Sequence, residues 1–141
     1  MLSRRASIVF AIADVLTALL LLFGVFVGLP TRWWPVDTSA LVLAAIEIAA
    51  GAGLLVGAGW AVRVARIAGL AALATGLFTV TLLAVTASWL SGVYGPVGHG
   101  GALILALVAA LVFPYLVVAP VIKLWWLRPG AEARPVASGR V

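Results

Sequence analysis

The sequence predicts an all-α membrane protein, a four-helix transmembrane bundle with both ends in the cytoplasm. Of its 141 residues, 65% are hydrophobic and 9% are charged, whereas soluble domains carry roughly 25% charged residues. Four apolar stretches are each long enough to cross a bilayer core about 30 Å thick as helices. The basic residues gather on one side of these stretches, which gives the predicted bundle its orientation.

The four expected spans are residues 6–29, 39–60, 64–91 and 102–127, within one transmembrane domain over residues 1–128. Asp14 interrupts the first span, Glu47 interrupts the second, the third has no charge, and Lys123 lies near the end of the fourth. The first stretch follows a basic N-terminal segment, as a signal peptide would. Its apolar run is longer than the usual 7–15 residues, however, so we expect a retained span.

The breaks between the spans have the chemistry of turns. Two prolines precede the second span, and Asp37, Thr38 and Ser39, where it begins, are candidates for the N-cap of its helix. Residues 61–66 read as a tight basic connection. Gly92–Gly101 contains five glycines and Pro96 and predicts an irregular loop. Residues 129–141 are rich in Pro, Gly, Ala and Arg, and predict a disordered cytoplasmic tail.

Orientation follows from the bias in Lys and Arg. Arg32 alone falls on one side of the predicted spans, and the positive-inside rule assigns the other side to the cytoplasm. That side carries Arg4, Arg5, Arg63, Arg66, Lys123, Arg128, Arg134 and Arg140. All six tryptophans lie at predicted span ends, where indole favours the headgroup level. These patterns predict a multi-pass protein of a bacterial cytoplasmic (inner) membrane.

Partners follow from the same charge pattern. The net charge of +5 is distributed over helix ends rather than over one face, so we expect a lipid bilayer and no nucleic acid as the partner. Small residues at helical spacing, such as Gly53 and Gly57, let helices approach closely. They indicate packing within the monomer, with a homo-oligomer as the alternative.

Asp14 and Glu47 are the strongest candidates for a functional site. A carboxylate in the bilayer core costs several kcal/mol, so it is seldom placed there without a role. Neither acid has an evident basic partner at its own depth, and burial then favours the neutral form. Three interpretations remain open: hydrogen-bonded contacts between helices, with Thr75 and Thr79 of the third span as partners; a proton or ligand site; or pairing with a partner subunit.

His99 is the only histidine, and it lies in the glycine-rich segment on the predicted outer side. It reads either as a solvated loop residue or as a pH-sensitive or ligand-contacting group near Tyr94 and Glu47. One histidine and no cysteine do not make a metal site within one chain. The residues themselves therefore predict no metal, no cofactor and no catalytic set.

The segment from Ala44 to Gly57, followed by Arg63–Ala68, resembles the DoxX-like family of small four-helix membrane proteins. The resemblance consists of a Glu, a Gly-rich Leu run and a short basic turn, with Glu47, Gly51, Gly53, Gly57 and Arg63 in the matching positions. It covers about a fifth of the chain, and the first helix departs from it. The resemblance implies a subunit linked to quinone-dependent sulfur or thiol oxidation, with quinone as the implied cofactor.

For function, the small size and short loops favour a non-catalytic subunit or scaffold of a membrane complex, bound to a protein partner or to copies of itself. The alternative is a small proton-coupled transporter or channel component that uses Asp14 and Glu47. No nucleophile–base pair or phosphate-binding loop favours an enzyme.

Overall fold

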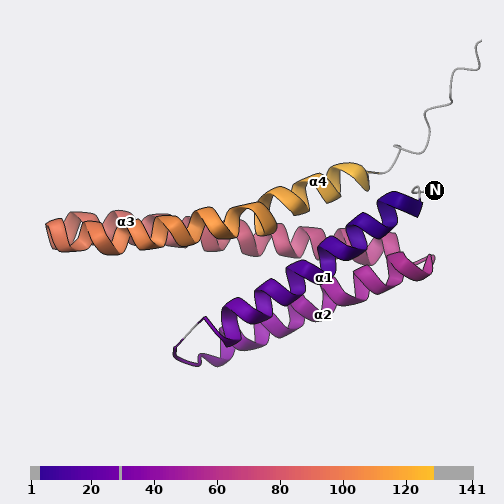
Figure 1. The fold of residues 1–141 in the computed structure, drawn as a ribbon, viewed down its shortest axis with the longest axis horizontal. Coiled ribbons are helices and arrows are strands. Elements are labelled where there is room, and N and C mark those ends of the chain that lie inside the picture. Colours follow the sequence, from indigo (N-terminus) through magenta and orange to yellow (C-terminus); the bar gives the residue numbers. More distant parts are fainter. Residues whose placement is uncertain (1–3, 29, 129–141) are drawn as a thin grey trace, which may run out of the picture.

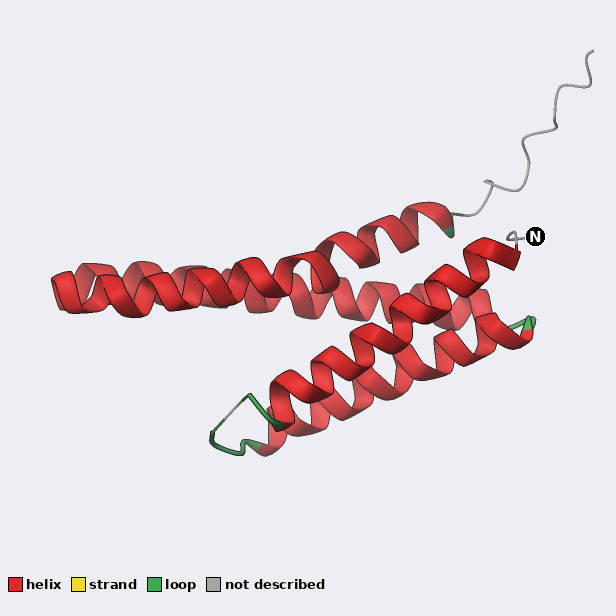
Figure 2. Ribbon diagram, in the orientation of Figure 1, coloured by secondary structure: helices red, strands yellow, loops and turns green. Residues whose placement is uncertain are grey.

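The computed structural model describes residues 4–28 and 30–128, and this part of the chain is helical apart from short turns (Figures 1 and 2). The helices are α1 (Arg4–Phe26), α2 (Trp34–Val56), α3 (Ala61–Phe113) and α4 (Ala119–Trp126), with a π-helical turn, η1 (Pro114–Val118), between the last two. Because α3, η1 and α4 are continuous, the described residues contain three helices long and apolar enough to cross a membrane: α1, α2 and the 66-residue segment Ala61–Trp126. The tail predicted over residues 129–141 lies outside the described residues.

The long helical segment reverses its direction at Gly95. This glycine has φ 55° and ψ −134°, which lies outside the helical region. Residues with a side chain rarely adopt this backbone conformation, whereas glycine does so readily. On either side of it, two arms of helix, residues 61–94 and 96–126, run antiparallel (Figure 1). Their register is fixed by contacts, since Gly69 lies against Leu124 and Gly76 lies against Leu116.

The irregular loop predicted over Gly92–Gly101 is therefore wrong. Helical backbone continues through this segment on both sides of Gly95. One left-handed glycine suffices for the reversal, and the following Pro96 has a φ angle suited to the first turn of a new helix. The close approach at the turn needs a second glycine, because a Cβ on Gly98 would overlap the Leu90 carbonyl.

The connection from α1 to α2 is shorter than predicted, because α2 begins at Trp34. Trp33 occupies the N-cap position without a side-chain cap, and Pro35 lies in the first turn, where its missing N–H is not needed. Asp37, Thr38 and Ser39 are thus inside the helix, and the prediction that they cap it is wrong. The Arg32 guanidinium closes the connection by donating to the Phe26 carbonyl at 2.7 Å and lying 3.9 Å from the Asp37 carboxylate.

The connection from α2 to α3 is formed by Gly57–Trp60, not by residues 61–66. Gly57 ends α2 in the left-handed conformation, with φ 69°. Arg63 and Arg66 consequently lie in the first two turns of α3. The start of α3, which carries both arginines, lies at the end of the molecule at which α1 begins (Figure 1).

Small side chains pack the helices together near that same end. Ala11 of α1, Ala50 of α2, and Ala65 and Ala68 of α3 have no exposed surface, and Phe10, Leu54, Ala61 and Leu127 complete the cluster. Close approach at small residues is the usual basis of helix contact in lipid, where apolar burial gives little driving force. Large apolar side chains elsewhere are exposed, which indicates contact with a lipid bilayer. The α1–α2 pair diverges from the hairpin toward the other end (Figure 1).

Candidate functional site

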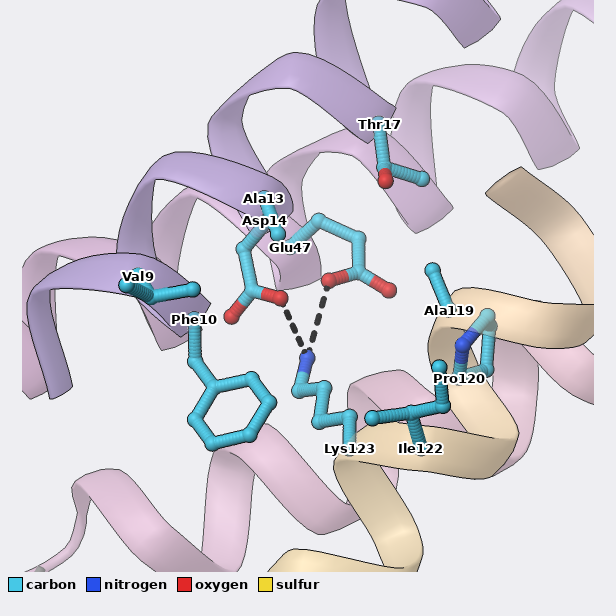
Figure 3. A pocket seen from close by; sticks show the side chains of 10 residues that line it. All are labelled: Val9, Phe10, Ala13, Asp14, Thr17, Glu47, Ala119, Pro120, Ile122 and Lys123. Carbon is cyan, nitrogen blue, oxygen red and sulfur yellow. Dashed lines mark hydrogen bonds and ion pairs between the residues drawn. The ribbon is translucent and has the colours of Figure 1, made fainter. Parts of the chain in front are cut away.

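Three ionisable side chains from three helices meet inside the bundle (Figure 3). The Lys123 ammonium of α4 donates to Asp14 Oδ1 of α1 at 2.6 Å and to Glu47 Oε2 of α2 at 3.2 Å. The three residues are only 2–4% exposed. The sequence-based expectation that neither acid has a basic partner at its own depth is therefore wrong, because both acids share the Lys123 ammonium.

All three residues lie at one depth because of the hairpin register. Asp14 lies ten residues after the start of α1 and Glu47 lies nine residues before the end of α2, roughly 15 Å from the same end at 1.5 Å per residue. Lys123 lies beside Gly69, eight residues into α3, with its Cδ 3.7 Å from the position of a glycine Cβ. The end of α4 thus lies beside the second turn of α3. Lys123 is therefore farther from the end of the bundle than its place near the end of the last span suggests.

The backbone before Lys123 is irregular, which affects where this side chain points. Pro114 has no N–H to donate to the preceding turn, and the π-helical turn η1 begins there. A π-turn adds a residue to the helix, and each residue rotates the side chains that follow by about 100°. The helix is thus irregular at this π-turn, and α4 bends away from the line of α3 (Figure 1).

A cavity of about 180 Å³ lies directly beside the three charged groups. Its walls are mostly apolar, and Val9, Phe10, Ala13, Thr17, Ala119, Pro120 and Ile122 complete the lining (Figure 3). Asp14 Oδ2 is buried and has no hydrogen-bond partner within residues 4–28 and 30–128. The space is large enough for roughly six water molecules at about 30 Å³ each, and a buried carboxylate oxygen is the kind of group that such water satisfies.

The cluster contains one more acid than base. If all three groups are ionised, its net charge is −1, and an unpaired charge in a medium of low dielectric constant is costly. One added proton makes the cluster neutral while Lys123 stays bonded to the remaining carboxylate. The arrangement can therefore hold and release a proton, and its donors and acceptors can bind water or a small polar group.

The other candidate residues from the sequence lie elsewhere. Thr75 is exposed and lines an open groove between α2 and α3 that it shares with Trp34 and Thr38, and the half-buried Thr79 does not line the cavity either. His99 is exposed at the tip of the hairpin, beyond the reversal at Gly95. Thr17, one turn from Asp14, is the threonine that lines the cavity.

Lys123 is the residue that sequence reasoning missed as a site residue. It was assigned to the cytoplasmic side because it lies near the end of the last span. The available signal was the hairpin itself, since Lys123 and Ile67 are equally distant from Gly95 along the chain. Antiparallel pairing about this glycine places Lys123 about two turns inside the membrane end of α3, level with the two acids.

The fold and this cluster define an integral membrane protein of the α-helical, multi-pass class with a buried ionisable centre. Comparisons with protein-family models, with curated proteins and with solved structures found no match to this chain. The resemblance to the DoxX-like family, with its implied quinone, therefore stays a prediction.

Proposed function

We propose that this protein is a small proton-coupled transport or channel component of a bacterial cytoplasmic membrane, with Asp14, Glu47 and Lys123 as its proton-binding centre. One observation carries the proposal: two buried carboxylates share one ammonium group beside a cavity, and one Asp14 oxygen there has no hydrogen-bond partner in the described part of the chain. A purely structural contact is complete with one acid and one base. The second acid gives the centre a place for an exchangeable proton.

Reconstitution in liposomes that contain a pH-sensitive dye tests the proposal. After a potassium diffusion potential is imposed, we expect proton entry with the unaltered protein. Glu47→Gln removes an acid without changing the shape of the side chain, so the flux falls to the level of empty liposomes. His99→Ala is the matched control and keeps the flux. A flux that Glu47→Gln leaves unchanged would dismiss the proposal.

The proposal includes four passes with both ends in the cytoplasm. Its support is the reversal at Gly95, which divides the long helical segment into two antiparallel arms of more than 30 residues each. Each arm is thus at least about 45 Å long, more than a bilayer core of about 30 Å requires. Arg63 and Arg66 lie at the same end as the start of α1, in agreement with the positive-inside rule.

The chain has no cysteine, so an introduced thiol reports the topology directly. In intact cells, a membrane-impermeant maleimide is expected to label Thr31→Cys and His99→Cys, which lie in the first connection and at the hairpin tip. Gly59→Cys, in the connection between α2 and α3, is expected to react only after permeabilisation. Labelling of Gly59→Cys from outside in intact cells would exclude this orientation.

A second candidate function is the non-catalytic subunit of a membrane complex, which the distal part of the hairpin favours. Between Gly76 and Val112, Gly98 is the one buried residue. Two arms that pack mainly on each other over this length leave large apolar side chains exposed, and these offer a surface to a protein partner or to a second copy. Purification in a mild detergent tests this role, since a stoichiometric partner or a dimer supports it and a monomer that remains active alone opposes it.

A further inference from the structure

We propose that a groove between α1 and α4, with Arg5 at its mouth, binds an anionic phospholipid of the leaflet into which α1 begins. The groove has a volume of about 310 Å³ and is lined by Arg5, Ala6, Val9, Phe10, Ile122 and Trp126. This binding site is separate from proton exchange, and the inference does not depend on the proposed function.

The lining of the groove is charged at one end and apolar farther in, which matches the charged headgroup and apolar chains of a phospholipid. Arg5 supplies a cation at the level where α1 begins, and Trp126 lies at the end of α4, in the position typical of interfacial indole. Deeper in, Val9 and Ile122 make the walls apolar. The rings of Phe10 and Trp126 meet edge to face, with centroids 6.3 Å apart, and close one side of the groove.

The depth also matches one leaflet. The groove shares Val9, Phe10 and Ile122 with the cavity beside Asp14, so the two spaces adjoin. Asp14 lies nine residues beyond Arg5, roughly 13 Å deeper along α1 at 1.5 Å per residue. Half of a bilayer core about 30 Å thick is of similar length. A headgroup phosphate at Arg5 therefore places an acyl chain along Val9 and Ile122, with its end near the cavity.

The charge at this end of the molecule selects an anionic headgroup over a zwitterionic one. Arg4, Arg5 and Arg128 are all exposed. Arg4 and Arg5 begin α1 and Arg128 follows α4, and the start of α1 and the end of α4 lie at the same end of the molecule (Figure 1). Basic groups at the membrane surface attract anionic lipids, and a pocket between helices adds a fixed position for the chain. The consequence is a lipid that covers the lateral opening of the cavity beside the ion-pair cluster.

Native mass spectrometry of the full-length protein in micelles with equal amounts of phosphatidylglycerol and phosphatidylcholine tests the site. We expect phosphatidylglycerol to be retained preferentially by the unaltered protein. Arg5→Gln is expected to lower its affinity about 5-fold. Arg63→Gln removes a charge from the same membrane end but outside the groove, and leaves the affinity unchanged. Val9→Trp fills the groove and lowers retention with every charge in place.

Three results would overturn the proposal. Equal retention of the two lipids by the unaltered protein excludes a site for an anionic lipid, and this measurement needs no variant that has to fold. Equal losses from Arg5→Gln and Arg63→Gln indicate general surface charge instead of a site. Undiminished retention by Val9→Trp places the lipid outside the groove.

Discussion

The two ends of the helical hairpin formed by residues 61–126 differ in packing and in charge. Near its open end, α3 buries Ala61, Ala65, Ala68 and Gly69 against the other helices, and α4 brings Lys123 to two acids. Toward the tip, residues 77–111 bury only Gly98 and carry no Asp, Glu, Lys or Arg. Small residues and one ionic cluster thus hold the open end together, whereas large exposed apolar side chains suit the tip to lipid. Substitutions in the two regions therefore test what stabilises this fold.

The largest loss of stability is expected for Lys123→Met. The methionine keeps most of the length of the side chain but leaves two buried carboxylates without their shared donor. Removing one partner of a buried ion pair costs about 3–5 kcal/mol. Unfolding by SDS in mixed micelles measures the change in the free energy of unfolding.

A neutral replacement of the whole cluster is the matched control for Lys123→Met. Lys123→Met combined with Asp14→Asn and Glu47→Gln removes every charge, and we expect it to recover most of the lost stability, because well-packed neutral groups often replace buried ion pairs without cost. If Lys123→Met alone is as stable as the unaltered protein, the three groups do not form the contacts described above.

A smaller loss is expected for Gly76→Ala, at the boundary between the two regions. A Cβ at Gly76 would overlap the Leu116 backbone of the opposite arm, so the arms have to move apart. Overpacking of this kind costs about 1–3 kcal/mol. Gly92→Ala is the matched control in the tip region, where the new Cβ would meet no described atom within 4 Å apart from its own turn of helix. Similar losses from both substitutions in the SDS titration would show that the arms do not pack at Gly76.

The helices and the two buried acids can be predicted from the sequence, whereas the position of Lys123 depends on how the two arms of the hairpin align. Hydropathy alone predicts the helical class and the membrane spans, because each span has to satisfy its own backbone hydrogen bonds in lipid. The cost of burying Asp14 and Glu47 identifies two of the three cluster residues from the sequence. Lys123 could not be assigned without the position of the reversal, since the count of glycines predicted a loop where the single residue Gly95 turns the chain.

The boundaries of the helices are also hard to predict from the sequence, because several residues compete to begin a helix. Asp37, Thr38 and Ser39 have strong capping preferences, but Pro35 allows α2 to begin earlier, and Ser39 donates instead to the Val36 carbonyl at 3.0 Å. One interpretation of the sequence predicts Thr75 and Thr79 as hydrogen-bond partners of the two acids. The divergence of the α1–α2 pair from the hairpin leaves Thr75 beside an open groove, which no local pattern in the sequence encodes.

Within the cluster, Glu47→Gln is expected to cost less than Lys123→Met. The remaining Asp14–Lys123 contact, 2.6 Å long, is then a balanced pair with no net charge. The substitution removes one hydrogen bond to a charged group, which lowers the free energy of unfolding by about 1.5–3 kcal/mol. It also removes the excess negative charge of the cluster, and this reduces the loss. The SDS titration at neutral pH measures it. A loss as large as that of Lys123→Met would mean that Glu47, rather than Asp14, is the main partner of the lysine.

The smallest effect is expected for His99→Ala at the hairpin tip. His99 is exposed, and no hydrogen bond or ion pair of its side chain occurs among the described residues. Surface substitutions of this kind change stability by no more than about 0.5 kcal/mol. The same titration is therefore expected to give nearly equal stabilities for His99→Ala and the unaltered protein. A loss well above this value would show that the tip of the hairpin contacts another group, and would make the tip a binding surface.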